Sequence, residues 1–79
     1  MSLTDLSQLP FGQKALVTRL SRQAAPFRRK LLAMGITPGC ALEVVRKAPL
    51  GDPIEISLRG FRLCLRQQEA AVIEVEVLA

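Results

Sequence analysis

The side chains that most often perform catalysis or bind metal are scarce in this sequence. There is no histidine, so the commonest general base and a common ligand of soft metals are absent. Cys40 and Cys64 are the only cysteines, and their separation does not match the clustered spacing of zinc or iron sites. The 7 acidic residues are scattered, and no glycine-rich loop precedes a helix to bind phosphate. We therefore expect no catalytic residue, no bound metal and no cofactor.

The overall charge is mildly basic, with 11 Lys and Arg against 7 Asp and Glu and a formal net charge of +4. This balance fits an ordinary hydrated surface, and it also fits a basic patch that contacts an acidic protein, nucleic acid or anionic lipid. Nucleic acid is not the expected partner, because the chain has no Trp or Tyr on which bases stack. Its three phenylalanines are expected in the core.

The chain shows neither an apolar run long enough to span a membrane nor an N-terminal leader pattern. We therefore expect a cytoplasmic protein whose two cysteines stay reduced. The 79 residues are expected to form a single domain over 1–79, because two domains would each be too small to bury a core.

The clearest structural pattern lies on both sides of Arg59-Gly60. Apolar residues occupy every second position from Ile54 to Leu58 and again from Phe61 to Leu65, which is typical of strands with one buried face. If Arg59-Gly60 is a two-residue turn, the apolar residues of the two strands oppose one another on that face. The expected pairs are Leu58/Phe61, Ile56/Leu63 and Ile54/Leu65, with Glu55 and Arg62 close enough to form an ion pair. On this basis Leu63→Ala is expected to cost about 2–5 kcal/mol.

The rest of the chain predicts further strands and one main helix. Strands are expected over residues 14–20, 41–47 and 72–78, the helix at about 25–34, and short helical turns over 4–8 and 66–70. Pro26 suits the first turn of that helix, and Gly35 suits its end. The proline-rich segment 48–53 predicts a loop. Five strands at short spacing predict a mainly β fold, a small five-stranded barrel.

Three motifs closely resemble the FeoA family, the small cytosolic accessory proteins of bacterial ferrous-iron transport. They are Leu-Leu-Ala-Met-Gly-Ile-Thr-Pro-Gly (31–39), Val-Val-Arg-Lys-Ala-Pro-Leu-Gly-Asp-Pro-Ile (44–54) and Arg-Gly-Phe-Arg-Leu-Cys-Leu-Arg (59–66), followed by Glu69-Ala70. The resemblance implies an SH3-like barrel. It also implies a non-enzymatic role in support of the membrane permease FeoB, whose cytosolic end carries a GTP-binding domain. The family serves a transition metal ion, yet this chain offers no evident iron site.

If the resemblance is functional, some surface residues of this chain are expected to contact FeoB. Leu50 lies at the tip of the 48–53 loop, where it either contacts the partner or folds back over the mouth of the barrel. Leu32 lies one position off the apolar helix face and is either partly exposed or part of the core. Arg28, Arg29 and Lys30 oppose the helix macrodipole, so they are either screened by solvent or meet an anionic partner.

The sequence is also compatible with other functions. The same barrel occurs in metal-dependent repressors, so an SH3-like peptide- or protein-binding domain serving a soluble regulator is the main alternative. A location at the inner face of the membrane would follow from binding to the permease. Self-association through sheet edges or exposed loops is a further possibility that the sequence leaves undecided.

Overall fold

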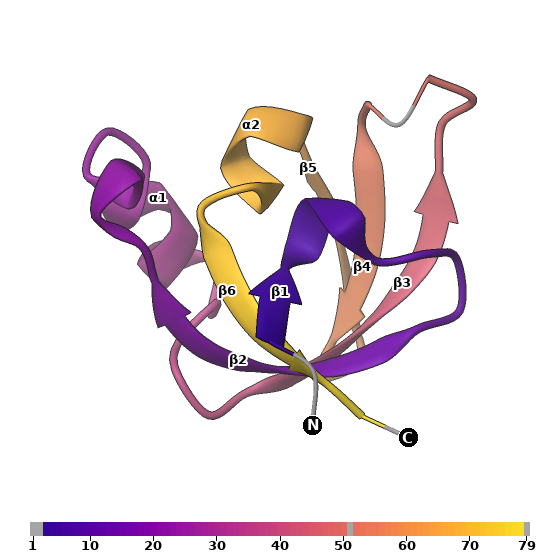
Figure 1. Ribbon diagram of the computed structural model, residues 1–79, viewed down its shortest axis with the longest axis horizontal. Coiled ribbons are helices and arrows are strands. Elements are labelled where there is room, and N and C mark those ends of the chain that lie inside the picture. Colours follow the sequence, from indigo (N-terminus) through magenta and orange to yellow (C-terminus); the bar gives the residue numbers. More distant parts are fainter. Residues whose placement is uncertain (1–2, 51, 79) are drawn as a thin grey trace.

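The computed structural model describes residues 3–50 and 52–78, which form one curved antiparallel sheet with short helices packed on it (Figure 1). The strand order is β1-β6-β2-β3-β4-β5, so β1 and β5 are the two edges of the sheet. The predicted loop residue Gly51 lies outside the described residues. The strands are β1 (Leu3–Asp5), β2 (Lys14–Leu20), β3 (Ala41–Lys47), β4 (Ile54–Leu58), β5 (Phe61–Leu65) and β6 (Ile73–Val77).

The sheet has six strands rather than the five expected, because β1 lies where a helical turn over 4–8 was predicted. The chain from Leu3 to Asp5 pairs with β6, with Thr4 opposite Val75. The helical turn η1 (Leu6–Gln8) begins only after that, and the Asp5 carboxylate caps it by accepting a hydrogen bond from the Ser7 amide at 2.9 Å. Pairing with a neighbouring strand therefore outweighs the local three-residue spacing of leucines.

The main helix α1 (Arg28–Ala33) is shorter than the expected 25–34. A separate helical turn, η2 (Arg22–Ala24), precedes it, and Phe27 stands at its N-terminal boundary without a side-chain cap. Phe27 has φ −111° and ψ −5°, which departs from regular α-helical geometry, so the helix begins at Arg28 and Pro26 lies before it instead of in its first turn. The C-terminal end of α1 is as predicted, because the chain leaves the helix at Gly35 with φ +92°. A side chain at this position would also be crowded, since a Cβ would lie 3.3 Å from Leu58 Cδ2. The second helix, α2 (Gln67–Ala70), is one short turn.

The hairpin of β4 and β5 has the predicted register. Arg59 and Gly60 both have positive φ, 52° and 83°, which makes the turn a type I′ reversal. The prediction that all the apolar residues of β5 are buried is wrong. Leu65 is fully buried, Leu63 is half-buried and Phe61 is 71% exposed. The reason is that β5 is an edge strand, so nothing covers its first residues from the outer side.

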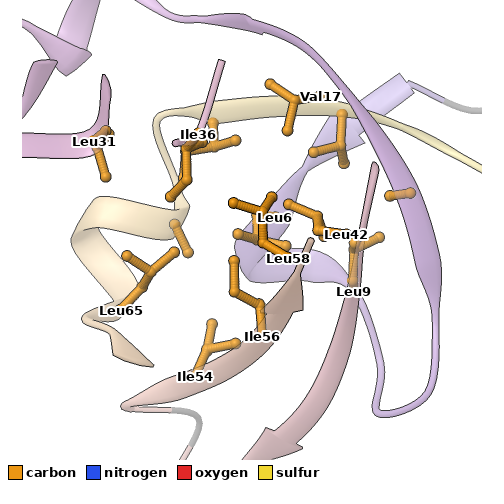
Figure 2. Packing of buried hydrophobic residues seen from close by; sticks show 14 of the residues in the cluster. Leu6, Leu9, Val17, Leu31, Ile36, Leu42, Ile54, Ile56, Leu58 and Leu65 are labelled. Carbon is orange, nitrogen blue, oxygen red and sulfur yellow. The ribbon is translucent and has the colours of Figure 1, made fainter. Parts of the chain in front are cut away.

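The core contains side chains from the helical segments and from every strand except β1 (Figure 2). Leu6 and Leu9 enter it from η1 and the residue after it, Leu31 comes from α1, and Ile36 follows that helix. The strands supply most of the remainder, and Figure 2 labels Val17, Leu42, Ile54, Ile56, Leu58 and Leu65 among them. The expectation of three buried phenylalanines is wrong, because Phe11 and Phe61 are exposed and only Phe27 packs against the core.

Candidate functional site

Leu50 stands at the tip of the loop between β3 and β4 and is 92% exposed. This exposure excludes the alternative in which Leu50 folds back over the mouth of the barrel. A hollow at the base of the loop is lined by Lys47, Pro49, Pro53 and Cys64, among others. An apolar side chain at a loop tip, beside such a hollow, is available to a partner without any rearrangement of the core.

The surface of α1 carries the predicted cations. Arg28, Arg29 and Lys30 are all exposed, and Leu32 on the same helix is 38% exposed. No ion pair holds Arg28 or Arg29 within residues 3–50 and 52–78. From Leu6 to Leu42 the sequence has no acidic residue at all, so the helix has no local source of counter-charge. We call Arg28, Arg29 and Leu32 the α1 surface.

Lys30 differs from its two neighbours because its charge is matched inside the molecule. Its Nζ lies 2.6 Å from Glu69 Oε2, and Glu69 Oε1 accepts a hydrogen bond from the Arg66 backbone amide at 2.9 Å. Glu69 is only 4% exposed. Lys30 therefore connects α1 to α2. Of the three cations of α1, only Arg28 and Arg29 have no ion-pair partner among the described residues. Sequence reasoning missed Glu69, because 39 residues separate it from Lys30.

The same contacts set the protonation of Glu69. Burial alone would raise its pKa, but the hydrogen bond from Lys30 and the backbone amide of Arg66 outweigh burial and hold the pKa below the ordinary value of 4.5. Because the folded-state pKa is the lower one, the carboxylate stabilises the fold fully above about pH 4.5. That contribution disappears as the pH falls through the folded-state value.

Glu69→Gln is therefore expected to lower the free energy of unfolding by about 1–2 kcal/mol at neutral pH. Urea denaturation between pH 7 and pH 3 measures the effect. The difference between the original chain and Glu69→Gln should shrink as the pH falls, because protonation makes the original carboxyl neutral as well. Arg19 and Glu74 form an exposed pair at 3.0 Å, so Glu74→Gln is the matched control, with a loss below about 1 kcal/mol. A constant difference for Glu69→Gln at every pH would contradict the assignment.

The structure keeps the two candidate contacts apart. In Figure 1, α1 lies on the left and the loop between β3 and β4, which contains Leu50, lies at the upper right, so this loop and α1 are on different sides of the molecule. A single small ligand does not touch both. A partner that covers both must be a macromolecule that wraps around the sheet, or the two surfaces act separately.

The described residues hold no group of three or more His, Cys, Asp or Glu side chains arranged to bind a metal ion. Cys40 is a buried free thiol and Cys64 an exposed one. Glu55 and Arg62 approach to 4.0 Å across the hairpin, as the register predicted. No helix within residues 3–50 and 52–78 has the length and apolar character needed to cross a membrane.

A family model described as the FeoA domain matches residues 4–77. The chain belongs to the FeoA family. A curated relative from Porphyromonas gingivalis, described as an Fe(2+) transport protein A/Fe(2+) transporter FeoB fusion protein, is 36% identical over 94% of this chain. The chain spans only 9% of the length of that relative, so the match covers a small part of the fusion protein.

Solved FeoA structures have the same architecture. The FeoA-like protein of Clostridium acetobutylicum is 38% identical, with a TM-score of 0.90 over 100% of this chain and 91% of that one. The FeoA of Stenotrophomonas maltophilia, solved with zinc and described as a prokaryotic SH3 domain protein, is 29% identical, with a TM-score of 0.81 over 92% of this chain and 89% of that one. The expected mainly β, SH3-like fold is thus confirmed for this FeoA chain.

A manganese-dependent transcriptional repressor shares the fold as well, with a TM-score of 0.89. The match covers 99% of this chain but 38% of the repressor, at 22% identity. Identity this low shows a common fold and carries no information about function.

Proposed function

We propose that this FeoA chain is a non-enzymatic accessory protein of ferrous-iron uptake that acts by contact with the cytosolic GTP-binding region of the permease FeoB. The observation that carries the proposal is the P. gingivalis relative, whose description joins the two proteins in one polypeptide. Fusion gives two modules a high effective concentration for each other, which benefits proteins that work in contact. The protein would then be cytoplasmic and reach the inner face of the membrane through FeoB.

Two surfaces are proposed to make the contact. The α1 surface offers an exposed leucine and two guanidinium groups that have no ion-pair partner among the described residues. The planar guanidinium group of Arg can donate two parallel hydrogen bonds to one carboxylate. Leu50 offers an exposed apolar side chain at the tip of a loop. Lys30 is assigned a supporting part in this scheme, because it holds α1 in place through Glu69. An acidic surface on the partner is the complement of the acid-free segment from Leu6 to Leu42.

Leu50→Ala is expected to leave the melting temperature nearly unchanged and to reduce ferrous-iron uptake. The side chain is 92% exposed, so its removal opens no cavity in the core. Thermal unfolding of the purified variant and uptake of ferrous iron by cells that carry it in place of the original chain measure the two effects. Leu3→Ala is the matched control, because Leu3 is also exposed, at 70%, but lies on β1.

Two outcomes would count against the role given to Leu50. Unimpaired uptake with Leu50→Ala would remove it from the contact. A loss of stability above about 2 kcal/mol would instead make it a core residue. The proposed function itself would fail if purified cytosolic FeoB retained none of the original chain in any nucleotide state and cells lacking the chain took up ferrous iron normally.

A further inference from the structure

The outer edge of β5 carries backbone groups that point away from the protein. β5 pairs only with β4, and the type I′ turn at Arg59-Gly60 closes the pair. In such a hairpin the two residues that flank the turn exchange backbone N–H···O=C hydrogen bonds with each other. Along the two strands, every second pair of opposite residues is hydrogen-bonded in this way. Phe61, Leu63 and Leu65 therefore bond to β4, whereas the N–H and C=O groups of Arg62 and Cys64 face outward.

These outward groups have no partner in the part of the chain that the structure describes. No backbone or side-chain hydrogen bond there reaches the amide or carbonyl of Arg62 or Cys64, and both side chains are exposed. The other edge of the sheet, β1, is only three residues long. β5 is thus the longer open edge, and an open edge is a template for one more strand.

The side chains along this edge add apolar surface to the free backbone groups. Phe61 is 71% exposed, and the half-buried Leu63 follows it on the same face. On the opposite face Arg62 lies 4.0 Å from Glu55 of its own hairpin, so its charge is already partly matched. A strand that pairs here gains main-chain hydrogen bonds and covers an apolar strip at the same time.

We propose that β5 of a second copy of this chain occupies the edge, antiparallel to the first, in a two-fold symmetric dimer. The outward groups fix the register. Arg62 of each copy lies opposite Cys64 of the other, and each such pair exchanges two backbone hydrogen bonds. Leu63 then lies opposite Leu63 of the second copy in a non-hydrogen-bonded pair. In such pairs the two facing side chains are closer than in hydrogen-bonded pairs.

A second copy fits this edge because the edge is complementary to itself. Arg62 lies directly opposite the small, uncharged Cys64, so no two arginines form a directly opposed pair, and the two copies of Arg62 are diagonal neighbours on that face. Phe61 lies opposite Leu65 of the second copy, so each exposed aromatic ring lies beside an apolar position and not a charged one. The contact closes after two copies, because each β5 has only one free edge. A contact this short buries less area than a standard stable interface, so the dimer forms at high concentration and dissociates on dilution.

The test is a concentration series that combines sedimentation equilibrium with amide hydrogen exchange, under reducing conditions, from about 10 μM to about 1 mM. The apparent mass should rise from 8.7 kDa towards twice that value. Exchange at the amides of Arg62 and Cys64 should slow with rising concentration. Exchange at the amide of Leu63, which already bonds to β4, should show much less dependence on concentration.

Cys64→Pro removes the outward amide and should lower the association constant by about tenfold or more, since each dimer loses two hydrogen bonds. Proline is tolerated where the N–H of an edge strand faces solvent. Cys64→Ser is the matched control, because it keeps the amide and should keep the dimer. If circular dichroism shows that Cys64→Pro does not fold, Phe61→Ser takes its place. It should weaken association, whereas Leu50→Ser should not.

Three results would overturn the proposal. The first is a mass of one chain at every concentration, with unchanged exchange at Arg62 and Cys64. The second is a dimer in which these two amides still exchange freely, which would place the contact elsewhere. The third is protection that appears only when the cytosolic region of FeoB is added, which would assign the edge to a strand of that protein. Since the proposed FeoB contact uses the α1 surface and Leu50, the first two results would leave it standing.

Discussion

Ile56→Ala will lower the free energy of unfolding by about 2–5 kcal/mol, close to the whole stability of a domain this small. Ile56 is fully buried at the centre of β4, where it lies opposite Val44 of β3 and Leu63 of β5. Both neighbouring strands hold the backbone in place, so the surrounding side chains collapse only partly into the cavity. Urea denaturation at neutral pH and low protein concentration is the measurement.

Leu63→Ala is the matched comparison, because Leu63 is the cross-strand partner of Ile56. The sequence alone suggests a full core penalty for this change, but the structure leaves Leu63 half-buried on an edge strand. We therefore expect about half the loss seen with Ile56→Ala. Equal losses in the monomer would contradict the open edge described for β5.

Arg28→Glu combined with Arg29→Glu is expected to weaken binding to the cytosolic region of FeoB by about tenfold or more. The two guanidinium groups have no ion-pair partner among the described residues, so reversing their charge breaks no ion pair there. It places negative charge where the proposed partner is acidic, and like charges at an interface are costly. The affinity of the original chain should fall as salt is raised, and that of the double variant should depend on salt much less.

The control for this variant is Lys14→Glu combined with Arg59→Glu. Both residues are exposed cations outside the α1 surface, so the net charge changes by the same amount at a different place. Binding measured by fluorescence titration at two salt concentrations should separate the two variants. An equal loss of affinity in both would show that only net charge matters, and it would remove the specific role of Arg28 and Arg29.

Much of the fold follows from local patterns in the sequence. Alternation over 54–58 and again over 61–65 predicted both strands and their register, because a one-residue slip would expose every apolar side chain. Gly35 marked the end of α1 because its positive φ is unfavourable for other residues. β1 was missed because three residues show no periodicity, and its strand conformation depends on β6, about 70 positions later in the chain.

The candidate site was less predictable. Alternation shows which face of β5 is apolar, but it does not show that β5 is an edge strand with Phe61 uncovered. Three adjacent cations appeared equivalent in the sequence, and only the folded structure separates Lys30, which binds Glu69, from Arg28 and Arg29. One signal was available without a structure, namely the absence of acidic residues from Leu6 to Leu42. The Lys and Arg residues of this segment have no acidic residue near them in the sequence.

We propose that this chain acts by binding FeoB through its surface. The most direct test is a calorimetric titration of the chain against the cytosolic GTP-binding domain of its cognate FeoB, loaded in turn with GDP and with a non-hydrolysable GTP analogue. Saturable binding in at least one nucleotide state is the expected result. An absence of heat and of complex formation in both states, at protein concentrations that reach about 100 μM, would contradict it.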